Sequence, residues 1–249
     1  MRVTYGGQVF SYEVEGTLGQ PLIFLHGWGM SVQSFRSLAR YFDKRYRLYL
    51  LDLPGFGQAP LAATPLGVAD LASKIRNFGF ALQLSSVILV GYGLSGKIMC
   101  ATAARYSDWV ARLIAIDVVG PDQDRILKQA VRRLEWSAFL SRLPVVFELK
   151  QKAKQRLMAL VGTHDYDMAD LMRADLKTLA NYDTLATSRL VVTPTTLVWG
   201  AKDHRHLGDA KRFYKSLSKS KVVLLPAVGH LDANENPGVF SQGLLSVLG

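Results

Sequence analysis

Short apolar runs alternate with stretches of helical periodicity along most of this 249-residue chain. The apolar runs have the length of strands and end in Gly, Pro or Asp turns, whereas apolar residues recur every three or four positions between them. Strands with their following turns are expected at 8–16, 21–27, 46–57, 87–93, 110–117, 195–203 and 221–230. Helices are expected at 34–42, 67–84, after residue 93, at 208–218 and from about residue 236. Such an alternation predicts a mostly parallel sheet with helices on both faces.

The alternation lapses between residues 118 and 192. This stretch is helical in pattern, basic and rich in Met and Leu, and no strand stands out in it. We therefore predict an α/β core made of residues 1–117 and 193–249, interrupted by a helical cap at 118–192.

The composition is that of one large domain. About half of the residues, 49%, are hydrophobic, which suits a substantial core. Cys100 is the only cysteine, which excludes an intramolecular disulfide and a cysteine-based metal cluster, and we interpret it as a buried small side chain. The N-terminus lacks the apolar region of a secretory signal, and no apolar run approaches the ~20 residues of a spanning helix. We expect a soluble cytoplasmic protein without a membrane span.

The formal net charge is +10, and the excess of basic residues is concentrated in the predicted cap. Nine basic residues lie between Arg125 and Arg156, against two glutamates. They are Arg125, Lys128, Arg132, Arg133, Arg142, Lys150, Lys152, Lys154 and Arg156. A solvated helical face is the simplest interpretation, and an acidic partner is the alternative. No nucleic-acid-binding motif accompanies the charge, so we expect no nucleic-acid partner.

The stretch VILVGYGLSGKIM, residues 87–99, contains a glycine-rich turn between a strand and a helix. It fits the Gly-x-Gly-x-x-Gly turn of dinucleotide-binding proteins, with Asp117 as an acidic residue 21 positions after Gly96. It also fits the Gly-x-Ser-x-Gly nucleophile elbow, a sharp turn that exposes a catalytic serine, except that Gly93 stands where the serine belongs. The residue at this position of an elbow is expected to have a positive φ, which is strained for serine but free for glycine. The turn alone leaves both interpretations open.

The other strand ends favour the elbow, because ligands of α/β sheets bind at the carboxyl ends of the strands. These ends carry LHGWG at 25–29, DLPGFG at 52–57, GAKD at 200–203 and GH at 229–230. In this order they resemble the α/β-hydrolase family, and LHGWG resembles the carboxylesterases that cleave a pimeloyl methyl ester on acyl carrier protein. The resemblance implies an α/β-hydrolase fold: a mostly parallel central sheet flanked by helices, with a helical cap after the sixth strand.

The resemblance also implies a role for individual residues. His230 would be the general base and Asp203 the carboxylate that fixes its tautomer. The backbone N–H groups of Trp28 and Leu94 would form the oxyanion hole. Asp117 is a second candidate for the carboxylate. No cofactor or metal is implied, and the expected ligand is a small molecule.

The remaining histidines and Ser95 have simpler interpretations. We expect His26 to order its loop, and His164, His204 and His206 to be solvated loop or cap residues. Ser95 would lie about 200° around the helix from position 93 and away from His230, so it is not expected to replace the missing nucleophile. We interpret it as a small residue at a position that the family fills with small residues.

Three hypotheses about function follow from the absence of serine at position 93. In the first, a His230/Asp203 dyad activates water and the chain is a hydrolase of a small ester or related acyl substrate. In the second, the chain is a pseudohydrolase that binds a small apolar or acyl ligand. The third, a nucleotide-binding oxidoreductase, rests only on the glycine pattern. The basic cap motivates a further hypothesis, that the substrate is carried by an acidic partner such as acyl carrier protein.

Overall fold

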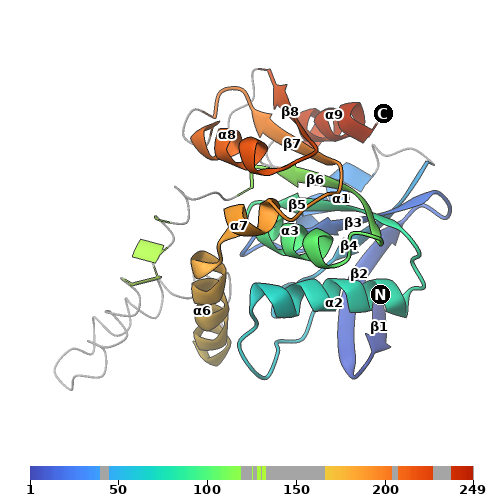
Figure 1. Ribbon diagram of the computed structural model, residues 1–249. Coiled ribbons are helices and arrows are strands. Elements are labelled where there is room, and N and C mark those ends of the chain that lie inside the picture. Colours follow the sequence, from blue (N-terminus) through green and yellow to red (C-terminus); the bar gives the residue numbers. More distant parts are fainter. Residues whose placement is uncertain are drawn as a thin grey trace.

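Eight strands form one sheet in the computed structural model of the chain, and helices cover both of its faces (Figure 1). The structure describes residues 1–39, 45–118, 166–203, 207–226 and 237–248, and in addition residues 125, 128, 129, 131 and 132. The strands are β1 (Arg2–Tyr5), β2 (Gln8–Glu15), β3 (Gln20–Leu25), β4 (Tyr46–Leu51), β5 (Val87–Tyr92), β6 (Val110–Ile116), β7 (Thr195–Gly200) and β8 (Ser220–Leu225). The described helices are α1 (Gln33–Ala39), α2 (Val68–Ala81), α3 (Ser95–Arg105), α6 (Tyr166–Asn181), α7 (Thr184–Ser188), α8 (Leu207–Ser216) and α9 (Pro237–Leu248).

The strand order is β1-β2-β4-β3-β5-β6-β7-β8. Every neighbouring pair from β4 through β3, β5, β6 and β7 to β8 is parallel. Strand β2 is antiparallel to both of its neighbours, β1 and β4. The predicted fold class, a mostly parallel sheet with helices on both faces, is therefore confirmed. Strand β1, which the sequence pattern did not single out, adds an antiparallel edge through a hairpin with β2.

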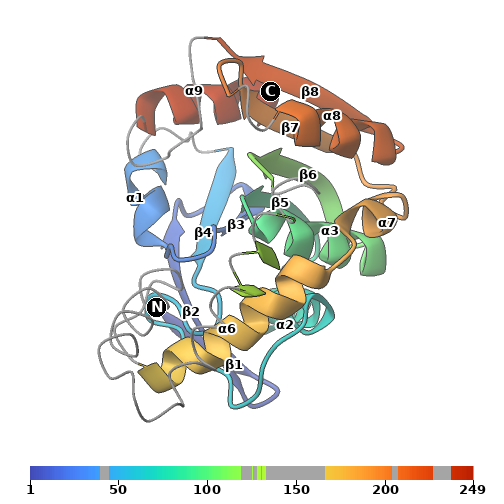
Figure 2. The same ribbon diagram turned by 90° about the vertical axis from the view of Figure 1, so that its left-hand side faces the viewer.

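Alternate residues of the central strands face opposite sides of the sheet and enter two separate cores. In β3, Ile23 and Leu25 pack with α2, α3 and α8, while Leu22 and Phe24 pack with α1 and α9. Figure 2 shows these two groups of helices on opposite sides of the strands. The unbroken apolar sequence of the central strands is explained by this burial on both faces.

The predicted cap lies mostly outside the described residues. Its described part includes α6 and α7, and α7 packs against α3 and α8. Helix α6 is joined to the loop before α2, because Asp175 Oδ1 accepts a hydrogen bond from Leu66 N at 2.5 Å and Thr178 Oγ1 donates to Leu66 O at 3.0 Å. Burial raises the pKa of Asp175 to about 6. The boundaries of the cap, 118–192, stay a prediction.

Candidate active site

The turn between β5 and α3 is the centre of the candidate site. The last residue of β5, Tyr92, pairs with Ile116 of β6, and Gly93 N donates to Ile116 O at 3.0 Å. Helix α3 then begins at Ser95, two residues after Gly93. The turn therefore projects from the carboxyl edge of the sheet, where ligands of parallel sheets bind.

Gly93 has a backbone conformation that favours glycine. Its φ is +58°, in the left-handed region. Apart from its two chain neighbours, no atom of the residues that the structure describes would lie within 4 Å of a Cβ atom built on Gly93. The positive φ expected for an elbow is confirmed, and, among the described residues, only backbone strain would oppose a side chain at position 93.

The loop after β3 packs directly on this turn. Ser95 is buried, and its hydroxyl donates a hydrogen bond to the backbone oxygen of His26. A Cβ atom on Gly27 would come within 2.9 Å of the Tyr92 ring, so the backbones of the loop and turn are close. Ser95 is therefore more than the small residue that the sequence suggested, because its hydroxyl joins the two segments.

Both ring nitrogens of His26 take part in hydrogen bonds inside the protein. Leu53 N donates to Nε2 at 2.9 Å, which leaves Nδ1 as the protonated nitrogen, 2.8 Å from Gly27 O. Burial lowers the pKa of His26, although the bond to Gly27 and the charge of Asp52 oppose this shift. A neutral, buried histidine with both nitrogens occupied is suited to ordering the loop, as expected, and not to proton transfer.

The backbone N–H groups predicted to form an oxyanion hole have no acceptor among the described residues. Neither Trp28 N nor Leu94 N donates a hydrogen bond to any residue in the part of the chain that the structure describes. The two residues also pack in one apolar cluster with Val131 and with Leu176 of α6. These two N–H groups therefore come from neighbouring segments, and both are available to a ligand.

The indole of Trp28 adds a third unused donor to this cluster. Its Nε1 is buried and has no hydrogen-bond partner among the described residues. The ring is held edge-on against Phe56, with the two centroids 4.9 Å apart. Phe56 also packs against His26, at 5.4 Å. Phe56 was not predicted to lie at the site. In the sequence, only its position in the Gly/Pro loop after β4 could have indicated this.

Two buried aspartates follow the neighbouring strands. Asp117 comes directly after β6 and is 2% exposed, and its φ of +45° is unusual for a residue other than glycine. Such a conformation costs ~1–3 kcal/mol and persists only where the surrounding structure holds it. Asp203 lies three residues after β7, is 5% exposed, and its N–H donates to Gly200 O at 3.1 Å. Both candidate carboxylates therefore lie at the same edge of the sheet as Gly93.

The predicted general base, His230, lies outside the described residues, as do His164, His204 and His206. Cys100 is fully buried in α3, and burial raises the pKa of its thiol to about 12. It is therefore the inert small side chain that the sequence suggested. No group of three or more His, Cys, Asp or Glu side chains suited to a metal ion occurs among the residues that the structure describes.

A family model for the α/β hydrolase fold matches residues 20–180, which is more than half of the chain. The chain belongs to the α/β-hydrolase fold family. The matched segment begins with β3, contains the β5–α3 turn and reaches into α6. The glycine-rich turn thus occurs within a hydrolase fold and after the fifth strand, not in a first βαβ unit as in dinucleotide-binding domains.

The relatives of this α/β hydrolase include esterases and lipases. Monoacylglycerol lipase ABHD6 from Bos taurus is 23% identical over 265 aligned residues, which cover 96% of this chain and 79% of the lipase. Pimeloyl-[acyl-carrier protein] methyl ester esterase from Chromobacterium violaceum is 27% identical over 232 residues, covering 86% and 89% of the two chains. A solved structure of a thermophilic esterase from Thermogutta terrifontis has a TM-score of 0.74 and 19% identity, covering 100% of this chain and 97% of the esterase. This last similarity shows the fold alone.

The described helices of this α/β hydrolase include none that is both long and apolar enough to cross a bilayer. The cytoplasmic location suggested by the sequence stays a prediction.

Proposed function

We propose that this α/β hydrolase cleaves a small ester or related acyl substrate by activating water. In this mechanism, His230 is the general base and Asp203 orients its ring. Water attacks the acyl carbon as its proton passes to His230, and the proton then passes to the departing alcohol oxygen as the ester C–O bond breaks. The products are the free acid and the alcohol, and no covalent acyl-enzyme forms because Gly93 has no side chain.

The open space above Gly93 is the observation that carries this proposal. Because no atom of the described residues beyond its chain neighbours lies within 4 Å of a Cβ built there, a water molecule can occupy the volume that a serine side chain would fill. Gly93 also adopts the positive φ of an elbow without the strain that serine would suffer. Loss of the nucleophile therefore leaves the turn intact and opens a place for the attacking water.

The backbone N–H groups of Trp28 and Leu94 also support the proposal, because they can serve as an oxyanion hole. Both lack acceptors among the described residues, and both belong to segments that pack together. In our mechanism they donate hydrogen bonds to the oxyanion of the tetrahedral intermediate. Such donors contribute about 10²- to 10³-fold each to the rate of acyl transfer. Relatives named as an esterase and a lipase agree with an ester substrate.

We expect His230→Ala to lower ester turnover by about 10²-fold or more, since general-base catalysis contributes ~10²–10⁴-fold. Asp203→Asn should also lower turnover, because an amide cannot stabilise the imidazolium. The measurement is the hydrolysis rate on a panel of short- and medium-chain acyl esters. Asp108→Asn is the matched control, because Asp108 is exposed and precedes β6, at the opposite edge of the sheet. Unchanged turnover in His230→Ala would refute the dyad.

A pseudohydrolase is the second candidate function, and the absence of a side chain at Gly93 favours it. In this alternative, the chain binds a small apolar or acyl ligand under the cap without converting it. Saturable binding without turnover would distinguish it from the hydrolase. The third interpretation, an oxidoreductase, depends only on the glycine pattern, and a lack of NAD or NADP binding in calorimetry would remove it.

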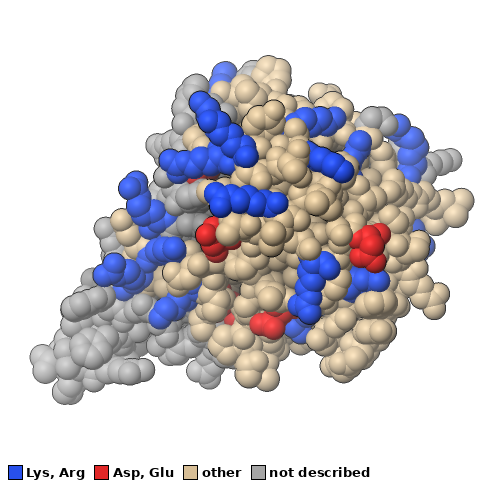
Figure 3. Space-filling model, in the orientation of Figure 1, with Lys and Arg blue, Asp and Glu red and all other residues tan. Residues whose placement is uncertain are grey.

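A basic surface supports the proposal that the substrate arrives on an acidic carrier protein. Figure 3 shows Lys and Arg side chains gathered over α8, α7 and the region of 125–132, with few acidic ones between them. A cavity of about 600 Å³ between this region and the start of α7 is lined by Arg125, Lys128 and Arg132. Binding of an acyl carrier protein should therefore weaken between low and high salt, and salt-independent binding would contradict this proposal.

A further inference from the structure

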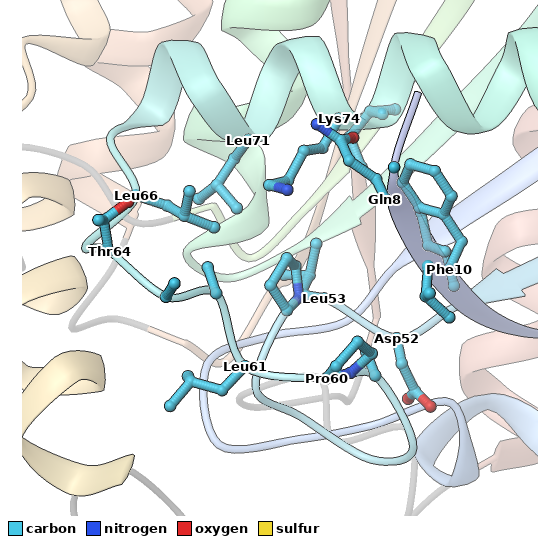
Figure 4. Close-up of a pocket in the computed structure, with 18 residues that line it drawn as sticks. Gln8, Phe10, Asp52, Leu53, Pro60, Leu61, Thr64, Leu66, Leu71 and Lys74 are labelled. Carbon is cyan, nitrogen blue, oxygen red and sulfur yellow. The ribbon is translucent and has the colours of Figure 1, made fainter. Parts of the chain in front are cut away.

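A second cavity lies away from the β5–α3 turn, between β2, the loop after β4 and α2 (Figure 4). Its volume is about 370 Å³, within the range of small-molecule sites. Its lining does not include Gly93, Leu94 or any residue of the 26–29 loop. Most of its wall is apolar. The apolar lining includes Phe10, Leu53, Pro60, Leu61, Leu66 and Leu71.

Two polar side chains of this cavity, Lys74 and Gln8, lie where α2 and β2 meet. Lys74 reaches from α2 into the cavity, and the amide of Gln8 from β2 lies beside it (Figure 4). Asn77 Nδ2 donates to Gln8 Oε1 at 3.3 Å, so the Gln8 amide nitrogen is left as a donor. One end of the cavity therefore carries an ammonium and an amide N–H₂, both of which donate.

The ammonium of Lys74 has no partner in the part of the chain that the structure describes. It forms no hydrogen bond or ion pair with any residue that the structure describes. Burial lowers the pKa of Lys74, although the charge of Asp70 one turn earlier opposes this shift. A partly desolvated cation without a partner is stabilised by an anion that binds beside it.

Asp52 is the one carboxylate among the described residues that line the cavity, and its oxygens accept hydrogen bonds from backbone N–H groups. Asp52 Oδ1 accepts from Val32 N at 2.9 Å, and its Oδ2 accepts from Gln58 N at 2.9 Å. In Figure 4 its carboxylate points away from Lys74. Asp52 therefore orders the loop after β4 and does not neutralise Lys74.

We propose that this cavity binds a monocarboxylate with an apolar chain, such as a medium-chain fatty acid. The carboxylate would accept hydrogen bonds from Lys74 Nζ and the Gln8 amide, and the chain would lie against Leu53, Leu66 and Leu71. A neutral amphiphile of the same length would leave the ammonium unpaired. The site is independent of the proposed hydrolysis, because it shares no residue with the proposed catalytic or oxyanion groups.

The test is the binding of octanoate to the full chain by isothermal titration calorimetry at low salt. Lys74→Met keeps the length of the side chain and removes its charge, and it should weaken octanoate binding by about tenfold or more. Lys74→Arg should bind within about threefold of the natural protein, because the charge remains. Lys215→Met is the matched control, since Lys215 is exposed on α8, and it should bind octanoate as the natural protein does.

Binding of 1-octanol tests the contribution of the carboxylate, because octanol has a chain of the same length without the charge. We expect it to bind at least about tenfold more weakly than octanoate to the natural protein, and equally to Lys74→Met and the natural protein. No octanoate binding, equal affinities for octanoate and octanol, or full octanoate affinity in Lys74→Met would each overturn the proposal. Circular dichroism checks that Lys74→Met is folded. If the natural protein hydrolyses no ester but binds octanoate and loses this binding in Lys74→Met, the proposed function is contradicted and the present inference stands.

Discussion

Gly93→Ser is expected to raise ester turnover by about 10²- to 10⁴-fold over the natural protein. In serine hydrolases, loss of the nucleophile costs about 10⁶-fold in kcat, and a site that has lost its serine should recover only part of this. The turn can accept a serine, because φ at Gly93 is +58° and the new Cβ would lie within 4 Å of no described residue beyond its chain neighbours. A burst of the alcohol product, equal to the enzyme concentration, would report the acyl-enzyme.

Gly93→Ala is the control for this gain. Both variants place a Cβ at a positive φ, so both should lose about 1–3 kcal/mol in the free energy of unfolding. Only the serine variant should gain turnover. If Gly93→Ser hydrolyses esters no faster than Gly93→Ala, the assignment of this turn as a nucleophile elbow is wrong. If Gly93→Ser hydrolyses esters and the natural protein shows no turnover, the pseudohydrolase is favoured.

Gly96→Ala is expected to destabilise the fold by about 2–4 kcal/mol. A Cβ on Gly96 would lie 2.2 Å from Cγ1 and 2.5 Å from Cγ2 of Val118, which is 1% exposed. Because Gly96 lies within α3, alanine would otherwise favour the helix by about 1 kcal/mol, so a loss must come from overpacking. Urea denaturation measures the change in free energy.

A double-mutant cycle with Val118→Ala tests the cause of this loss. Removing both Cγ atoms relieves most of the clash, so the double variant should be more stable than the sum of the two single changes predicts, by about 1 kcal/mol or more. Additive changes would show that the cost of Gly96→Ala arises elsewhere. The same contact fixes α3 against the segment that follows Asp117, so Gly96→Ala should also lower any turnover of the natural protein.

Much of the fold could be predicted because its signals are local. The apolar runs and the helical spacing between them identified the central strands and the helices that cover them. Predicted boundaries differed by a few residues, as in α2, which ends at Ala81 although helical spacing continues to Leu84. Strand β1 was not singled out, because four mostly exposed residues at a sheet edge carry little hydrophobic pattern.

The candidate site was only partly predictable. Gly93, Leu94 and Trp28 could be found from turn motifs, because a sharp strand-to-helix turn and a glycine loop each have a characteristic local sequence. The hydroxyl of Ser95 was taken as merely small, since its acceptor, His26 O, is 69 residues away in the chain. The cavity beside Lys74 was equally hidden, because its wall comes from β2, a loop and α2.

The sequence by itself therefore determined the order of strands and helices, the positive φ at Gly93 and the absence of a nucleophile there. These properties depend on residue type and on the few neighbours along the chain. Only the tertiary structure decided which distant groups meet: Ser95 with the His26 backbone, Gly96 with Val118, and Lys74 with an apolar cavity. The physical reason is that such contacts depend on how whole elements pack, and the periodicity of each element is compatible with many packing partners.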